Sequence, residues 1–507
     1  QPREDSERKR RLDEGMRSIV NELEREAEDR VGKRDLIEKR WLRDLRQYNS
    51  EYEADIQKNL KETEKSQLFI NQTRPKTNAC EARLFDMLFP TDDDNWEIKP
   101  TPVPELSDAA TEAKEQAAAL VDQADEAMKA GDEGQARQIA GEAQAHANKA
   151  QELKAEMDEA RKRSKAMTAE MRDQLEECGY NIACRDVIRD SCQLGAGIML
   201  GPVGTNERSR RAWKNQESNV YNLEMVDDTR PSFQRVDPWG WFPQSDALCV
   251  EESESFFERH LKTPKAMRKL ARESGFDQDA IRRVLKDGPK NSLPGYVSEL
   301  RAIQGDSVAQ DDKRFVVWCY RGPLSVENLR VFCECTGQDV EKYGAGEDID
   351  PLNEVSVVIW FCQTEALKFG IHHLDSDEMV YSVFSIEEDQ ASIWGFGIPY
   401  IMRHSQAAMN AAWRMMMDNS SLASGPQIEI DTSVIEPADG EWTLTPRKIW
   451  LRKSGASANK PGFNATNIAS NQAELAAIIE LSKKFIDDET AISVLAQGEQ
   501  GATTQTM

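Results

Sequence analysis

Two segments combine residue types that could do chemistry with spacings close to known motifs. The glycine-rich run Gly195 to Pro202 is similar to loops that bind phosphates. It lacks the Gly-Lys-Ser/Thr ending through which a lysine reaches a nucleotide and a hydroxyl binds magnesium, so we interpret it as a strand edge or a site of tight packing. His372 and His373 stand near three acidic residues between 375 and 378. Neither the His-Glu-x-x-His spacing nor a nucleophile motif accompanies them, which favours a loop beside a sheet.

Two further clusters could hold a metal ion. The acidic trio Asp92 to Asp94 could bind calcium, but the adjacent Pro90 and Asn95 favour a turn. Cys333 and Cys335 are predicted to lie on one face of a strand, and no His or Cys cluster in the sequence supplies the remaining ligands. The nine cysteines include no Cys-x-x-Cys pair, so we expect buried, reduced thiols. We therefore expect no catalytic residues, no metal and no cofactor, and a protein that is not an enzyme.

Composition narrows the class of protein. At 507 residues, with 31% charged residues, the chain is expected to form two or more domains with long solvated helices. No apolar run approaches the ~18 residues of a membrane span, and the charged segment 1–11 does not resemble a signal peptide, which predicts a cytoplasmic origin. The formal charge of -25 argues against gripping DNA by neutralising its phosphates. The negative charge is compatible with a channel wall that DNA slides past. It is equally compatible with a role in solubility alone.

The pattern of elements predicts an α+β protein. Residues 1–65 are dense in charged residues, with apolar residues spaced to form one face of a helix. This pattern predicts solvated amphipathic helices. The Ala-rich segment 104–178, interrupted by one Gly-containing turn, predicts an antiparallel helical hairpin inserted into the body. Runs rich in β-branched and aromatic residues at 314–320, 329–335 and 355–361 predict an antiparallel β meander.

Two helices, at 400–422 and 471–487, bracket a small strand-rich module. Strands are predicted within it at 427–431, 442–444 and 449–451. The first helix is rich in alanine and methionine, and little of the chain is expected to cover it, so its core should be shared between subunits. The module is too small to fold alone and should pair with its neighbours in a ring. The predicted interface residues are Ala408, Met409, Ala412, Met416 and Ile479.

This order of elements resembles the portal, or head-to-tail connector, proteins of short-tailed bacteriophages. The resemblance is carried by the segments Trp41–Tyr52, Leu84–Pro104, Asp237–Ala247 and, most specifically, Gly395–Trp450. It implies a helical wing over 1–395, a first stem helix at 396–424, a clip at 425–455, a return segment and second stem helix at 456–488, and the start of a tunnel loop at 489–507. The hairpin at 104–178 departs from the family, and we expect the crown and barrel of the family to be absent from this sequence.

The resemblance also implies a function and partners. The chain would form a ring of about twelve copies at the capsid vertex of the virion, after synthesis in the host bacterial cytoplasm. Double-stranded DNA would pass through it, without sequence specificity, during packaging and ejection. The implied partners are the terminase large subunit, a tail adaptor, and the major capsid and scaffolding proteins, and no membrane is involved. The alternative is a coiled-coil scaffold or tail adaptor, which the hairpin would suit but the strand module would not.

Two sets of site residues follow. The clip is expected to dock partners through aromatic anchors in a polar rim; its residues are Glu436, Asp439, Trp442, Arg447, Lys448 and Trp450. Lys483 and Lys484 could contact DNA phosphates as a basic band, or could simply balance neighbouring acids on the helix surface. The predicted channel lining comprises Lys483, Lys484, Asp487, Asp488, Glu489, Gln497, Glu499, Thr503 and Thr504.

Overall fold

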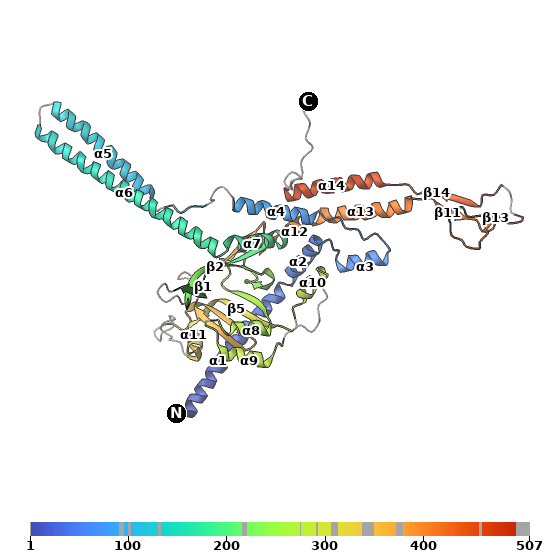
Figure 1. Cartoon of the computed structure of the whole chain (residues 1–507), viewed down its shortest axis with the longest axis horizontal. Coiled ribbons are helices and arrows are strands. Elements are labelled where there is room, and N and C mark those ends of the chain that lie inside the picture. Colours follow the sequence, from blue (N-terminus) through green and yellow to red (C-terminus); the bar gives the residue numbers. More distant parts are fainter. Residues whose placement is uncertain are drawn as a thin grey trace.

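The structure, a computed structural model, contains a body and two long projections. It describes residues 2–90, 96–99, 103–129, 133–214, 221–273, 275–290, 293–305, 313–336, 349–371, 379–455 and 459–492. Figure 1 shows a helical hairpin leaving the body in one direction and a two-helix stem, ending in a small strand module, leaving in the other. The predicted α+β class is confirmed. Among the described helices, none is long and apolar enough to cross a membrane.

The body is built on a five-stranded antiparallel sheet with the strand order β3-β4-β5-β6-β7. Helix α1 packs against it, and its Ile19, Val20 and Leu23 are buried together with Phe257 and Phe332. Helices α8 to α10 complete this part of the body. The elements are α1 (Pro2–Lys33), β3 (Trp241–Phe242), β4 (Phe256–Lys262), α8 (Pro264–Leu270), α9 (Gln278–Asp287), α10 (Gly295–Ile303), β5 (Phe315–Ser325), β6 (Glu354–Cys362) and β7 (Glu365–Ile371).

The predicted meander is right for two of its three runs. The runs at 314–320 and 355–361 lie in the neighbouring strands β5 and β6. The strand predicted at 329–335, which contains Cys333 and Cys335, is wrong, because these residues lie in helix α11 (Val326–Thr336). Leu329, Phe332 and Cys333 are buried at helical spacing on one side of α11, and this periodicity outweighs the β propensity of the residues.

A second sheet, with the order β2-β1-β8, confirms the packing role of the glycine-rich run. A Cβ added at Gly197 would lie 2.0 Å from the carbonyl oxygen of Val187, and one at Gly195 would lie 2.1 Å from that of Gly395. Only glycine permits such close approaches between backbones. The elements are α7 (Tyr180–Leu194), β1 (Ala196–Lys214), β2 (Tyr221–Val236), β8 (Tyr381–Ser385), β9 (Glu387–Asp389) and β10 (Ser392–Phe396).

Two of the polar segments weighed as possible sites lie outside the described residues. These are the acidic trio Asp92 to Asp94 and the histidine pair His372 and His373. The turn and the loop predicted for them stay predictions.

A buried arginine, which the sequence did not single out, joins the N-terminal helices to the sheet. Arg34, between α1 and α2 (Asp35–Tyr48), donates to the carbonyl oxygens of Pro238 at 2.8 Å, Trp239 at 2.6 Å and Trp241 at 2.6 Å. Its guanidinium also lies 3.8 Å from the ring centroid of Phe242. These contacts hold the aromatic and proline corner that includes the short 3-10 helix η1 (Pro238–Gly240).

Both projections are antiparallel helix pairs. The hairpin predicted over 104–178 is confirmed as α5 (Val103–Lys129) and α6 (Glu133–Glu177), and its buried positions include Ala113, Ala117 and Ala143. The stem comprises α13 and α14, and its base rests on α4 and α12. These elements and the nearby α3 are α3 (Ala54–Glu62), α4 (Thr73–Leu88), α12 (Ile398–Ile401), α13 (Arg403–Ala423) and α14 (Gln472–Thr490).

The tip of the stem contains two pairs of short antiparallel strands. β11 pairs with β14, and β12 pairs with β13. The predicted strands at 427–431 and 449–451 correspond to β11 and β13, whereas 442–444 is not a strand. The pairing of β14 brings residues beyond 455 into the same module. The strands are β11 (Gln427–Ile430), β12 (Ile435–Pro437), β13 (Trp450–Arg452) and β14 (Phe463–Thr466).

A candidate oligomer interface on the stem and tip

The stem has a core of its own, which corrects one sequence-based expectation. Met409 is fully buried, Ala412 is 4% exposed and Ile479 is 6% exposed, and they pack in one cluster with Ile486. These three predicted interface residues therefore face the interior of the chain and not a second copy. The reason is that α14 and the body at α4 and α12 cover this side of α13. Of the other predicted interface residues, Ala408 is exposed and Met416 is half-buried.

Polar contacts fix the base of the stem to the body. The Gln406 side chain donates to the carbonyl oxygen of Ile70 at 2.5 Å, and the Ile70 amide donates to Asn410 Oδ1 at 2.9 Å. On the other side, the buried Lys76 of α4 donates to the Asp487 carboxylate and to the carbonyl oxygen of Ile492. Asp487, predicted to line a channel, is thus engaged by the body. The stem should move with the body and not as a free arm.

One face of the stem remains apolar and exposed. Met415 is 59% exposed, and on α14 Ile478, Leu481 and Phe485 are 46%, 52% and 50% exposed. Each of these residues directly precedes a residue that faces the interior of the stem. On each helix the exposed apolar residues therefore form a row that is rotated by about 100° around the helix axis from the row of core residues. Because α13 and α14 are antiparallel, this equal offset places both rows on the same side of the stem. We call this surface the stem face, and it comprises Ala408, Met415, Leu422, Ile478, Leu481 and Phe485.

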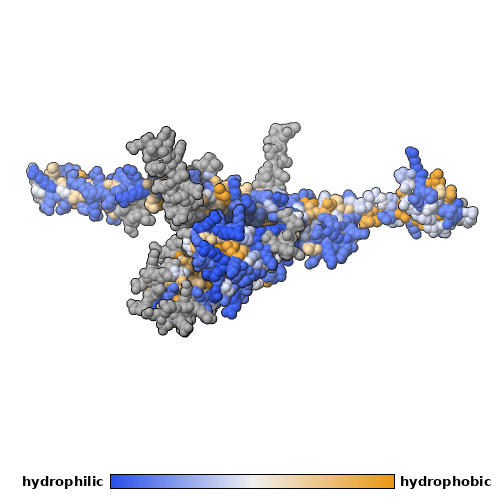
Figure 2. All heavy atoms as spheres, turned by 60° about the horizontal axis from the view of Figure 1, so that its bottom comes forward, coloured by the Kyte–Doolittle hydropathy of each residue, from blue (hydrophilic) through white to orange (hydrophobic). Residues whose placement is uncertain are grey.

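Two contacts fix how the rows of the stem face lie beside each other. The Ser405 hydroxyl donates to Glu489 at 2.8 Å, and the Gln472 side chain donates to Ser420 at 2.7 Å. This register brings the small Ala408 beside the bulky Phe485. Figure 2 shows apolar side chains on the stem and on the tip, whereas much of the body surface is hydrophilic. Exposed apolar surface of this kind commonly marks a site of protein association.

Of the predicted channel residues on α14, Lys483 and Asp487 lie away from the stem face, whereas Asp488 follows Phe485 by three residues and lies at the end of that face. Lys483 is 45% exposed and pairs with Glu480 at 3.3 Å, while Lys484 and Asp488 are exposed. Glu489 accepts the hydrogen bond from Ser405. The pairing of Lys483 agrees with the alternative in which these lysines balance neighbouring acids, and their contact with DNA stays a prediction. The remaining predicted lining residues lie outside the described part of the chain: Gln497, Glu499, Thr503 and Thr504.

At the tip, aromatic and charged side chains pack on one another. Trp450 is half-buried, with its ring centroid 5.9 Å from that of Trp442 and 5.2 Å from that of Phe463. The side chain of Lys448 is 3% exposed and pairs with Asp439 at 3.1 Å. Lys448 was predicted to dock partners, but its charge is already used inside the tip.

Several side chains at the tip remain exposed. Arg447 is exposed, Trp442 is 48% exposed, and the exposed Glu436 lies 3.8 Å from Lys453. The neighbouring sequence also presents large apolar side chains that the sequence analysis did not select. These are Leu444, Ile449 and Leu451, exposed by 53%, 68% and 50%.

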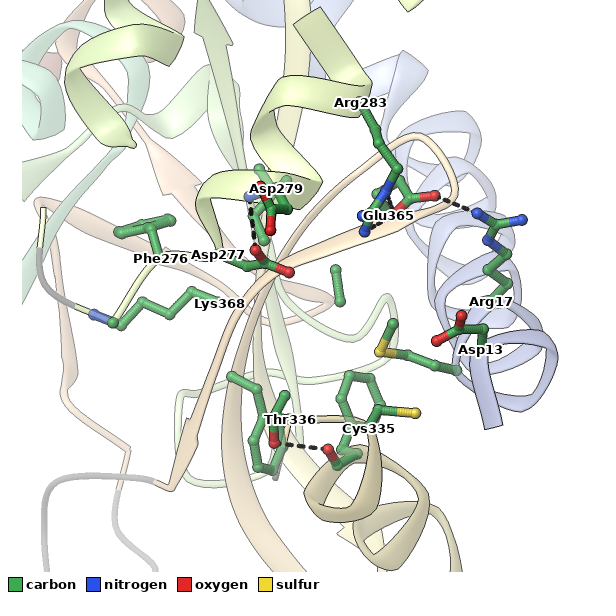
Figure 3. Close-up of a pocket in the computed structure, with 16 residues that line it drawn as sticks. Asp13, Arg17, Phe276, Asp277, Asp279, Arg283, Cys335, Thr336, Glu365 and Lys368 are labelled. Atoms are coloured by element: carbon green, nitrogen blue, oxygen red, sulfur yellow. Dashed lines mark hydrogen bonds and ion pairs between the residues drawn. The ribbon is translucent and has the colours of Figure 1, made fainter. Parts of the chain in front are cut away.

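A hollow in the body lies between α1, α9, α11 and β7, away from the stem. It has a volume of about 610 Å³. Figure 3 shows Glu365 between Arg17 and Arg283, each 2.7 Å from the carboxylate. The two arginines come from α1 and α9, so this carboxylate joins both helices to the edge strand β7. Because the glutamate is neutralised by both partners, we interpret the group as a structural cross-link.

Comparisons with known proteins leave the family open. No family model matches the chain, and no curated protein matches its sequence. Arguments about function therefore come from the stem face and the tip themselves.

Proposed function

We propose that this chain is the subunit of a portal-type ring through which double-stranded DNA passes into and out of a phage capsid. The observation that carries the proposal is the stem face, an apolar surface along a two-helix stem that the described part of the chain does not cover. A solvated protein with a charge of -25 has no need of such a surface unless another molecule covers it.

The unlike sides of the stem support a ring. The apolar residues occupy one side of the stem, while the charged residues Glu480 and Lys483 lie on another side of α14. Contact between unlike surfaces of neighbouring copies is heterologous, and such contacts close into rings when the rotation allows it. The net negative charge supports a passage role, because a wall of the same sign as the phosphates does not retain DNA.

The tip supports docking at the end of the stem. Its exposed Trp442, Ile449 and Leu451 lie close to the charged Glu436 and Arg447, which gives the apolar anchors and polar rim of a protein interface. In a portal-type ring the partners are the terminase large subunit during packaging and a tail adaptor afterwards. Major capsid and scaffolding proteins would surround the ring at the virion vertex.

The test is the assembly state of the purified full chain. Native mass spectrometry and negative-stain imaging should give a closed ring of about twelve copies with an axial hole. Leu481→Glu should dissociate the ring, because it places a carboxylate in the apolar contact. The matched control, Met167→Glu, replaces a similarly exposed apolar side chain on α6, 56% exposed against 52%, and should leave the ring intact. Rings that survive Leu481→Glu, or wild-type protein that stays monomeric, would contradict the proposal.

One observation favours the second candidate, a coiled-coil scaffold or tail adaptor. The hairpin of α5 and α6 projects far from the body, as an arm that joins other proteins would. That function predicts dimers or open assemblies without an axial hole, and it predicts that removing the hairpin, and not altering the stem face, abolishes assembly.

A further inference from the structure

A cleft rich in arginine lies where the stem meets the corner between α2 and α3. It has a volume of about 360 Å³. Arg43 and Arg46 of α2 form one wall, and Arg403 and Arg414 of α13 form the other. Two glutamates also line it, so four arginines and two glutamates give the lining a formal charge of +2. Within a chain of charge -25 this is a local reversal of sign.

Two of the four arginines are already paired with carboxylates, and two are available. Arg43 lies 3.1 Å from Glu53, and Arg46 lies 2.7 Å from Glu299. In the described part of the chain, neither Arg403 nor Arg414 lies within ion-pair distance of a carboxylate.

A further carboxylate, that of the buried Asp44, does not neutralise Arg403. It interacts with Arg40, Arg403 and Arg43 without a close ion pair. Burial raises the pKa of Asp44 to about 7, so this carboxyl is only partly charged at neutral pH. The cleft therefore keeps an excess of positive charge.

Stacking on tyrosine rings orients the guanidinium groups of the two available arginines. The guanidinium carbon of Arg403 lies 4.2 Å from the ring centroid of Tyr400, and that of Arg414 lies 4.8 Å from that of Tyr52. Arg414 also donates to the Tyr52 hydroxyl at 2.5 Å. An arginine that covers an aromatic ring with its flat face still directs N–H donors outward in its plane, where they match the oxygens of a phosphate. The tyrosines thus fix the orientation of the donors before a ligand arrives.

The spacing on α13 leaves room between the two arginines. Arg403, Ala407, Asn410 and Arg414 all line the cleft, and their spacing places them in one stripe along the helix. At a rise of about 1.5 Å per residue, the backbone positions of the two arginines are about 17 Å apart. Ala407 occupies little space between them, and Asn410 adds an amide to the stripe.

We propose that this cleft binds a run of neighbouring phosphate groups, held chiefly by Arg403 and Arg414. A backbone phosphate of nucleic acid and a free polyphosphate present the same oxygens, so either source would satisfy the site. The inference concerns a single chain and does not depend on ring formation.

Binding can be measured by isothermal titration of the full chain with sodium tripolyphosphate and by fluorescence anisotropy with a labelled DNA duplex. Wild-type protein should bind at least one of the two saturably at low salt, and more weakly as salt rises. Arg403→Gln with Arg414→Gln should weaken binding at least about tenfold, the loss expected when charge-assisted donors are removed. Arg163→Gln with Arg282→Gln removes the same charge from exposed ion pairs elsewhere and should leave binding unchanged.

Two further variants test the proposal if the double variant is unstable. The single change Arg43→Gln, at a side chain 52% exposed, should lower affinity several-fold without loss of fold. Arg403→Lys with Arg414→Lys keeps the charge but loses the planar donors and should bind less tightly than wild type.

The outcomes separate the two sources. Competition between tripolyphosphate and DNA identifies a site open to both, and binding of DNA alone assigns the site to the nucleic-acid backbone. The proposal is overturned if wild-type protein binds neither probe, if the double variant binds as wild type does, or if citrate binds as tightly as tripolyphosphate, since the last result shows a general carboxylate site.

Discussion

Two alanines on α13, four residues apart, should respond to the same substitution in opposite ways. Ala412 is 4% exposed inside the stem core, whereas Ala408 lies exposed on the stem face. A glutamate at 412 would place a carboxylate against Met409 and Ile479, at a cost of about 3–5 kcal/mol. That is a large share of the ~5–15 kcal/mol that stabilises a typical domain. Ala412→Glu should therefore unfold the stem of the isolated chain.

Ala408→Glu should leave the isolated chain stable to within about 0.5 kcal/mol, because surface substitutions rarely cost more. In an assembly the new carboxylate would be desolvated beside Phe485 of its own chain and the covering surface of the neighbour. A cost of about 3 kcal/mol for each contact corresponds to a more than 100-fold weaker association. The expected phenotype is a folded monomer.

The two changes are compared by guanidinium unfolding followed by circular dichroism and by light scattering after size-exclusion chromatography. Ala408→Ser is the matched control, since it stays small and uncharged and should assemble as wild type does. An Ala408→Glu protein that assembles normally would refute the role of the stem face. An Ala412→Glu protein with an unchanged unfolding midpoint would refute the stem core.

Three other perturbations follow from buried or exposed side chains. Lys76→Met removes the partner of Asp487 and should lower the free energy of local unfolding at the end of α14 by about 1–3 kcal/mol. Hydrogen exchange over 479–492 can measure this change, with the exposed Lys484→Met as the control. If the proposed partners, the terminase large subunit and a tail adaptor, bind at the tip, Trp442→Ala should weaken that binding by at least about tenfold in a pull-down titration without preventing assembly. Unchanged binding would remove the tip from the proposed interface. Asp44→Asn should stabilise the chain more at pH 8 than at pH 5.

The sequence predicted the long helices because their signals are local. Alanine, glutamate and lysine dominate α5 and α6, and a single Gly-containing turn separates them. The segment 329–335 was misassigned because its valine, phenylalanine and cysteines suit a strand. The helical assignment depends on α1 and β6, which receive its buried side, and these contacts are distant in sequence.

Three of the residues predicted for a stem interface, Met409, Ala412 and Ile479, lie instead in the core of the stem itself. Methionine and alanine mark a closely packed surface without saying whether the partner is the same chain or another copy. Met409 and Ala412 face α14, while Met415 lies on the exposed side. They differ in which side of α13 they occupy, and contacts such as Ser405 with Glu489 fix the side that packs on α14. The arginine cleft was missed for the same reason, since its walls on α2 and α13 are far apart in sequence.

The pH dependence at Asp44 tests the packing of α2 independently of any assembly. Burial, the largest cause, raises the pKa of this carboxyl from 3.8 to about 7, while Arg40, Arg403 and Arg43 act to lower it. The folded state thus binds the proton more tightly than the unfolded state, so its contribution to stability is fully present below pH 3.8 and is lost as pH rises through 7. At about 1.36 kcal/mol for each pKa unit, most of the loss falls between about pH 5 and pH 8.

Asparagine at this position cannot ionise and should avoid that loss. Relative to wild type, Asp44→Asn should gain on the order of 2–3 kcal/mol more at pH 8 than at pH 5, measured as the difference in the free energy of unfolding by urea. Asp35→Asn, at an exposed position of the same helix, removes the same formal charge and serves as the matched control. If the difference between Asp44→Asn and wild type were the same at both pH values, Asp44 would not be a buried, weakly compensated carboxyl, and the excess of positive charge inferred for the neighbouring cleft would have to be reduced.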